Sequence, residues 1–171
     1  MEPLSWNSLH PFEGLTCDLQ VEAGFLQNER GLKLAWRVQG DIPLVRWTSQ
    51  VGRENLWEQT CFEAFFQTNQ HPAYEELNIS PEKEWKLYRF TGYRTGQHSV
   101  SDLSWQIQVE KKVDSFLVQA NLLGPWPQVK RYSLTTILYL ADKPTHWACA
   151  HPKNRPDFHA PFAAAIENTF P

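Results

Sequence analysis

The sequence has little net charge and lacks any run of basic residues. Its 171 residues include 16 Lys and Arg against 19 Asp and Glu, which gives a formal net charge of −3. A protein that binds nucleic acid usually carries a strongly positive stripe. The composition therefore argues against nucleic acid as a main partner.

Long apolar runs are also lacking. No stretch approaches 18 consecutive apolar residues, the length at which a membrane-spanning helix is predicted. The amino-terminal sequence, MEPLSWNSLHPFEG, has no positive start followed by an apolar segment, so it does not resemble a secretory signal. These features predict a cytoplasmic protein that does not bind membranes.

Cysteine is scarce, and the usual motifs of covalent catalysis are missing. Cys17, Cys61 and Cys149 are odd in number, widely spaced and form no CxxC pair, so reduced thiols are expected rather than a disulfide framework. Patterns of the GxSxG type and glycine-rich phosphate loops do not occur. Cys61 lies among apolar neighbours in an extended segment, a setting that is typical of an inert thiol.

Aromatic residues, in contrast, are abundant. The chain has eight Trp, ten Phe and five Tyr against a single Met, with 42% hydrophobic and 20% charged residues. Aromatic side chains favour pleated surfaces and can form stacking platforms for sugars. The length and composition are those of one globular domain over residues 1–171.

Apolar and polar residues alternate with a period of two along most of the chain, which indicates β-strands. The last expected strand has the sequence FAAAI, which favours a helix by propensity, but it is too short for a stable helix. Short strands with turn signals between them predict an all-β sandwich or barrel with antiparallel pairing. About ten strands are expected, over residues 15–21, 32–38, 57–66, 74–79, 85–90, 105–109, 116–122, 132–140, 146–150 and 162–166.

A first candidate site lies in residues 56–66. On an extended strand Cys61, Glu63 and Phe65 share one face, and the other face is apolar as well, so Glu63 is expected to be partly buried. A buried carboxylate needs a partner, and a structural ion pair is an alternative to a ligand contact. The candidates for that partner are Arg53, Arg89, Arg94 and the histidines.

A second candidate site lies in residues 74–94. Asn78 falls on the side of its strand away from the core, and Trp85, Tyr88 and Arg94 follow it. Aromatic rings beside amide and guanidinium groups suit a sugar, because the rings stack on its C–H faces while the polar groups bind its hydroxyls. Ordinary core packing is the alternative explanation for the same rings.

A third candidate site lies in residues 146–159, which include Trp147, His151, Asp157 and His159. Two imidazoles and a carboxylate are metal ligands by type, but their spacing matches no standard zinc pattern. A capped turn explains the same residues without a metal: prolines brace it, and its histidines bond to the backbone. This is the preferred interpretation. No metal site is predicted.

Three strings in these segments resemble the small bacterial DOMON-like proteins, which are related to the family 9 carbohydrate-binding modules and to haem-binding DOMON domains. The strings are LWEQTCFEAF at 56–65, YEELNISPEKEWKLYRFTGYR at 74–94 and HWACAHPKNRPDFH at 146–159. The resemblance implies a two-sheet antiparallel β-sandwich of immunoglobulin-like or jelly-roll-like shape, whose relatives bind sugars or haem. The relatives tend to have His where this chain has Gln59.

Haem ligation of the kind found in these relatives is not expected here. Haem-binding DOMON domains commonly use a Met and a His as axial ligands, and the single methionine of this chain is Met1. Only a ligation by two histidines would remain. The sequence predicts no particular cofactor.

The leading hypothesis is a non-catalytic domain that binds a carbohydrate or a similar polar small molecule. One alternative is an enzyme acting on a sugar or small metabolite, and another is a protein-interaction or assembly domain with an aromatic interface. The oligomeric state is not determined by the sequence. The expected ligand-binding residues are Trp57, Glu63, Asn78, Trp85, Tyr88, Arg94, Trp147, His151, Asp157 and His159.

Overall fold

A computed structural model describes residues 3–15, 17–48, 54–68, 72–152, 154–160 and 166–168. In these residues the fold is all β and antiparallel, and the two helices are single 3-10 turns. None of the helices in the described parts of the chain is long and apolar enough to cross a membrane. The elements are β1 (Ser5–Pro11), β2 (Leu19–Asn28), β3 (Gly31–Gly40), η1 (Ile42–Leu44), η2 (Leu56–Glu58), β4 (Cys61–Gln67), β5 (Tyr74–Ile79), β6 (Trp85–Phe90), β7 (His98–Val100), β8 (Trp105–Lys111), β9 (Ser115–Leu123), β10 (Arg131–Leu140), β11 (Lys143–Ala148) and β12 (Ile166–Glu167).

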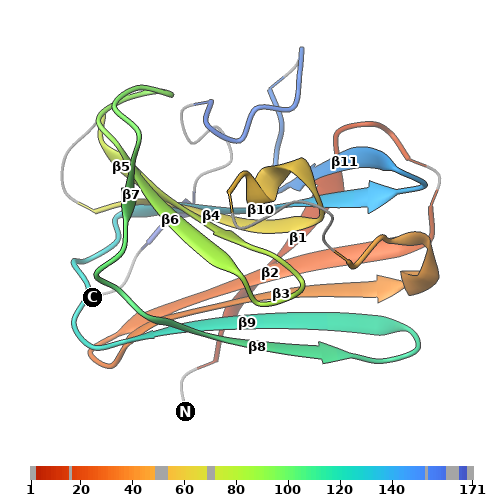
Figure 1. The fold of residues 1–171 in the computed structure, drawn as a ribbon, viewed down its shortest axis with the longest axis horizontal. Helices are drawn as coiled ribbons and strands as arrows, with labels where there is room; N and C mark the ends of the chain where they lie inside the picture. The colour runs from red at the N-terminus through yellow and green to blue at the C-terminus, as the bar shows by residue number, and fades with distance from the viewer. Residues whose placement is uncertain are drawn as a thin grey trace.

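Backbone pairing runs through all the strands without a break. The order is β7-β6-β5-β4-β10-β11-β1-β2-β3-β9-β8, and β12 pairs with β10. Strand β1 joins the strands from β7 to β11 in this order to those from β2 to β8, because it pairs with β2 along most of its length and with β11 at its end. We call β2, β3, β9 and β8 the β2 half, and β4, β5, β6, β7, β10 and β11 the β4 half (Figure 1).

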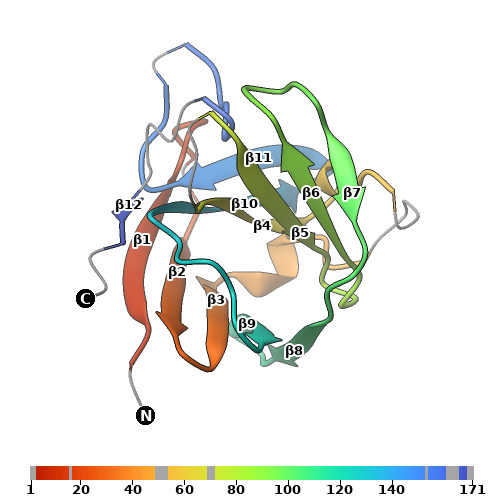
Figure 2. The ribbon, with the colours of Figure 1, turned by 90° about the vertical axis from the view of Figure 1, so that its left-hand side faces the viewer.

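The sheet curls so that its two halves face each other across the main core, as Figure 2 shows from the side. Trp36 of β3 is fully buried, and its indole Nε1 donates a hydrogen bond to the backbone oxygen of Thr135 in β10, at 3.0 Å. Phe25 of β2 stacks on Tyr132 of β10 with the ring centroids 3.9 Å apart. These contacts tie the halves together, and burial of such rings is the main source of stability.

Strand β4 is buried on both faces, as its sequence predicts. Phe62, Ala64 and Phe66 point into the main core, whereas Phe65 belongs to a second aromatic cluster on the outer face of the β4 half. An outer face of an antiparallel sheet is normally open to solvent. Here other segments of the chain cover the outer face of the β4 half, and the site lies between these segments and the sheet.

The predicted strands agree with the observed ones over most of the chain, but several differ at their ends, and the strand predicted over 146–150 is observed at Lys143–Ala148. The segment predicted as a strand over 57–66 begins only at Cys61, because residues 56–58 form η2 after Asn55, whose φ of 59° breaks the extended backbone. The strand predicted over 15–21 is observed at Leu19–Asn28, so it begins later and extends further than predicted. Strands β1 and β7 were not predicted, since each has few apolar residues. Residues 161–165, most of the predicted last strand, lie outside the described residues, as does Arg53.

The predicted division into two sheets takes a different form in the structure. The two facing layers are present as halves of one curled sheet, because β1 bonds to a strand of each half. A strand that bends between two layers can satisfy backbone groups in both of them. The all-β, antiparallel architecture is confirmed.

Candidate functional site

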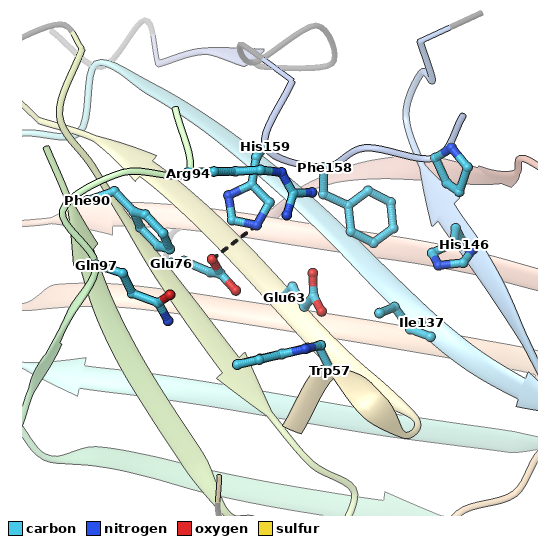
Figure 3. Close-up of a pocket in the computed structure, with 11 residues that line it drawn as sticks. Trp57, Glu63, Glu76, Phe90, Arg94, Gln97, Ile137, His146, Phe158 and His159 are labelled. Atoms are coloured by element: carbon cyan, nitrogen blue, oxygen red, sulfur yellow. Dashed lines mark ion pairs between the residues drawn. The ribbon is translucent and has the colours of Figure 1, made fainter. Parts of the chain in front are cut away.

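A pocket of about 350 Å³ lies on the outer face of the β4 half (Figure 3). Its floor is formed by side chains of β4, β5, β6, β10 and β11, which alternate outward from the sheet. Its walls come from η2, from the turn between β6 and β7, and from the loop at 151–160. The lining residues are Trp57, Glu63, Glu76, Phe90, Arg94, Gln97, Ile137, His146, Pro156, Phe158 and His159.

Glu63 lies on the floor of the pocket and is almost completely buried, with 3% of its surface exposed. Its Oε1 atom has no hydrogen-bond partner among the described residues. Burial, and then the nearby charge of Glu76, raises the pKa of the Glu63 carboxyl well above its ordinary value. An unpaired polar atom in this position is available to a ligand.

Glu76 is the second carboxyl group on the floor, and it is held in place on both sides. Its Oε1 accepts a hydrogen bond from Asn78 Nδ2 at 2.7 Å, and its Oε2 lies 3.5 Å from His159 Nε2. Burial raises the pKa of Glu76 to about 7. Burial, and then the charge of Arg94, lowers the pKa of His159 to about 4, so this imidazole is neutral at neutral pH.

The orientation of His159 is fixed by a tyrosine and by a cage of rings. The Tyr74 hydroxyl lies 2.7 Å from Nδ1 of His159 and accepts a bond from the backbone N–H of Arg94. With Tyr74 donating to Nδ1, the ring hydrogen lies on Nε2, the atom that faces Glu76. Phe65 and Phe90 contact the imidazole edge to face, with centroids 5.2 and 5.3 Å away.

Asp157 anchors the loop that forms one wall of the pocket. Its carboxylate accepts bonds from Tyr93 Oη at 2.5 Å and from Arg94 Nη2 at 2.9 Å, and its Oδ1 also accepts the backbone N–H groups of His159 and Ala160. Burial alone would raise the pKa of Asp157, but these donors outweigh burial and hold the pKa below its ordinary value. The bonds connect the 151–160 loop to the β6–β7 turn.

The β6–β7 turn places Arg94 at the rim of the pocket through an uncommon backbone conformation. Arg94 has a φ of 52°, in the left-handed region that non-glycine residues seldom adopt. The turn is closed by a bond from Thr95 N to the Gly92 oxygen and by one from Thr91 N to the Thr95 oxygen. Residues in such conformations occur at functional sites, where the surrounding bonds maintain them.

The structure brings together seven of the ten residues predicted to bind a ligand. Trp57, Glu63, Arg94 and His159 line the pocket, and Asn78, Tyr88 and Asp157 support them. Trp57 approaches Tyr88 edge to face, with the centroids 6.0 Å apart.

The other three predicted residues lie elsewhere. Trp147 is 2% exposed within the main core, and Trp85 packs against the same core. His151 is held by the backbone oxygen of His10, at 2.8 Å from Nε2, and does not line the pocket. A ring that is buried in the core offers no face to a ligand in the pocket.

The loop at 151–160 has the features of a capped turn. Asp157 accepts two backbone N–H groups of its own loop, and His151 is bonded to a backbone oxygen. The two imidazole rings and the Asp157 carboxylate contact different side chains or backbone oxygens. The described residues contain no group of three or more His, Cys, Asp or Glu side chains that could hold a metal ion.

Sequence reasoning missed part of the pocket. Glu76 carries the clearest overlooked signal, because it lies two residues before Asn78 and so shares its outward face. His146 and Phe158 lie within the third candidate segment but were not among the predicted binding residues, and Gln97 lies just beyond the second segment. They reach the pocket from separate loops and strands, which the sequence pattern does not connect.

Comparisons with known proteins show a shared fold. No family model matches the chain, and no curated protein matches it, so the likeness to DOMON-like proteins stays a prediction. A crystal structure from Bacteroides uniformis, described as a candidate carbohydrate-binding protein, has a TM-score of 0.66 at 11% identity, covering 92% of this chain and 83% of that one.

Two further solved structures have the same fold. They are family 9 carbohydrate-binding modules from Caldicellulosiruptor kristjanssonii. The complex with cellotriose has a TM-score of 0.53 at 14% identity, and the complex with glucose 0.51 at 13%. Each likeness covers 88% of this chain, and 75% and 76% of the module, respectively. At these identities the comparison establishes the fold of a carbohydrate-binding module.

Proposed function

We propose that this protein is a non-catalytic carbohydrate-binding domain that holds a sugar in the pocket on the outer face of the β4 half. The observation that carries the proposal is the combination of aromatic walls with a floor of buried polar groups, one of which has an unpaired oxygen. Sugar binding uses this combination, since rings cover the C–H faces and polar side chains bind the hydroxyls. The fold shared with carbohydrate-binding modules supports the same function.

Each group in the pocket has a distinct role in this proposal. Trp57, which is partly exposed at the wall, stacks on the sugar ring. Glu63 and Glu76 bind hydroxyls from below, and Arg94 donates hydrogen bonds from the rim. The cavity is at the small end of the range for ligand pockets, which suits a short saccharide or the end of a longer one.

Calorimetric titration with glucose and cellotriose tests the proposal. Trp57→Ala should weaken binding at least about tenfold, because loss of a stacked ring removes on the order of 1.4 kcal/mol or more. Trp6→Ala is the matched control. Trp6 is also partly exposed, but it lies under the guanidinium of Arg37 on the β2 half, so binding should be unchanged. Absence of binding to any mono- or oligosaccharide in a broad panel would contradict the proposal.

The pair of buried carboxyl groups supports a second candidate function, hydrolysis of a glycosidic bond. Glycosidases use two carboxyl groups, one of them with a raised pKa, and both Glu63 and Glu76 have raised pKa values. The same samples distinguish the two functions. Cellotriose that stays intact during long incubation indicates binding alone, whereas release of shorter sugars that stops in Glu63→Gln indicates catalysis.

A further inference from the structure

The pocket contains more carboxylates than its own cations neutralise. Glu63 forms no ion pair with a described Lys or Arg residue, and Glu76 is held by two uncharged groups, the amide of Asn78 and the neutral ring of His159. Arg94 is engaged by Asp157, whose other oxygen is 3.3 Å from Arg155. When all of these groups are ionised, the two guanidinium groups carry two positive charges and the three carboxylates, Glu63, Glu76 and Asp157, carry three negative ones. One negative charge is then in excess, and the same excess remains if only the lining residues Glu63, Glu76 and Arg94 are counted.

The unbalanced charge lies deep in the pocket, where removal from water makes an unpaired charge most costly. Glu63 is buried to the same extent as a core residue, and its side chain points into the cavity beside Glu76 (Figure 3). A buried carboxylate without a partner is costly, and without a ligand the site lowers this cost by keeping a proton. A cation that enters the pocket would supply the missing partner.

The aromatic rings that line the pocket also suit a cation. Trp57, Phe90 and Phe158 line the cavity around the two carboxyl groups. The faces of aromatic rings attract ammonium groups, and the attraction grows when both partners are removed from water. His146, another lining residue, is bonded to Glu13 at 2.6 Å and so adds no unpaired positive charge.

From this charge distribution we infer that the ligand carries a protonated amine, which binds the carboxylate of Glu63 while its ring packs on Trp57. The inference rests on the proposed carbohydrate-binding function and specifies the sugar as an amino sugar. A neutral sugar supplies no positive charge, so the carboxyl group of Glu63 forms no ion pair with it. An ammonium group donates to the unpaired Oε1 atom and balances the charge of the pocket in one contact.

Calorimetry near neutral pH with glucosamine, glucose and N-acetylglucosamine tests the inference, because only the first carries an amine. Glucosamine should bind at least tenfold more tightly than the two neutral sugars. Glu63→Gln, which keeps the shape and removes the charge, should reduce glucosamine affinity at least tenfold. Thermal unfolding of each variant shows whether it is folded.

Glu75→Gln is the matched control for loss of a carboxylate. Glu75 precedes Glu76 in β5, so its side chain lies on the opposite face, where it pairs with Arg89. Glucosamine affinity should be the same in this variant as in the original chain. If glucose binds as tightly as glucosamine, the amine inference is wrong and the carbohydrate-binding proposal stands. If none of the three sugars nor any other saccharide binds, the underlying proposal fails.

Discussion

At the scale of single residues, Glu76 and His159 are neighbours whose titrations affect stability with opposite signs. Burial raises the pKa of Glu76 to about 7, so the stability it contributes is complete below about pH 4.5 and is lost as the pH rises through 7. The pKa of His159 falls to about 4, so folding is favoured more as the pH rises from 4 toward 6.5. The two effects largely offset each other in the intact chain.

Replacing either residue should reveal the effect of the other. Relative to the original chain, Glu76→Gln should gain up to about 3 kcal/mol of unfolding free energy between pH 4.5 and 7, while His159→Gln should lose a similar amount between pH 4 and 6.5. Urea unfolding at several pH values measures both. Parallel pH profiles for the two variants would contradict the opposite effects of Glu76 and His159 on stability.

At the scale of elements, the β6–β7 turn connects the sheet to the rim of the pocket. Gly96 has a φ of 66°, and a Cβ atom there would overlap the side chain of Thr91. Two effects therefore oppose any larger residue at this position: the left-handed backbone and the steric conflict. The turn also carries Arg94, so any shift of its backbone moves a pocket residue.

Gly96→Ala should therefore cost about 2 kcal/mol or more of stability and weaken sugar binding. Gly14→Ala is the control, because Gly14 has a similar φ of 57° but nothing within 4 Å of the added Cβ. That variant should lose only about 1 kcal/mol, with unchanged binding. Chemical unfolding and titration of both variants provide the comparison. Equal losses in the two would show that packing against Thr91 has no role.

At the scale of the whole molecule, the two halves of the sheet depend on a shared core. Phe62 of β4 is fully buried between Trp36 of β3 and Phe116 of β9, with ring centroids 5.9 and 6.1 Å away. Phe62→Ala should cost roughly 3–5 kcal/mol, because it leaves a cavity between the halves. Both halves should still unfold in one transition.

Leu123→Ala serves as the control for this prediction, since Leu123 is 66% exposed at the end of β9. Its change in stability should stay within about 0.5 kcal/mol. Unfolding followed by both tryptophan fluorescence and circular dichroism measures the two variants. Two separate transitions would contradict the view that the halves form one cooperative unit.

Local patterns were enough to predict much of this architecture. Alternation predicted most of the strands, and the apolar residues on both sides of Glu63 predicted that this carboxyl group is buried. Its partner was not predictable in the same way. The sequence offered Arg89 and Arg94, but Arg89 pairs with Glu75 and Arg94 with Asp157. Pairing between charges depends on which loops meet, and strand periodicity carries no information about that.

The aromatic residues illustrate the same limit. Trp57, Trp85 and Trp147 were equivalent candidates by residue type, yet the structure puts only Trp57 in the pocket. The sequence by itself determined the all-β class and the buried position of Glu63, because side chains alternate along a strand at fixed spacing. Only the tertiary structure decided the pocket, because it forms where η2, the β6–β7 turn and the 151–160 loop meet over one face of the sheet. Contacts between segments so far apart in the chain follow from packing of the whole domain.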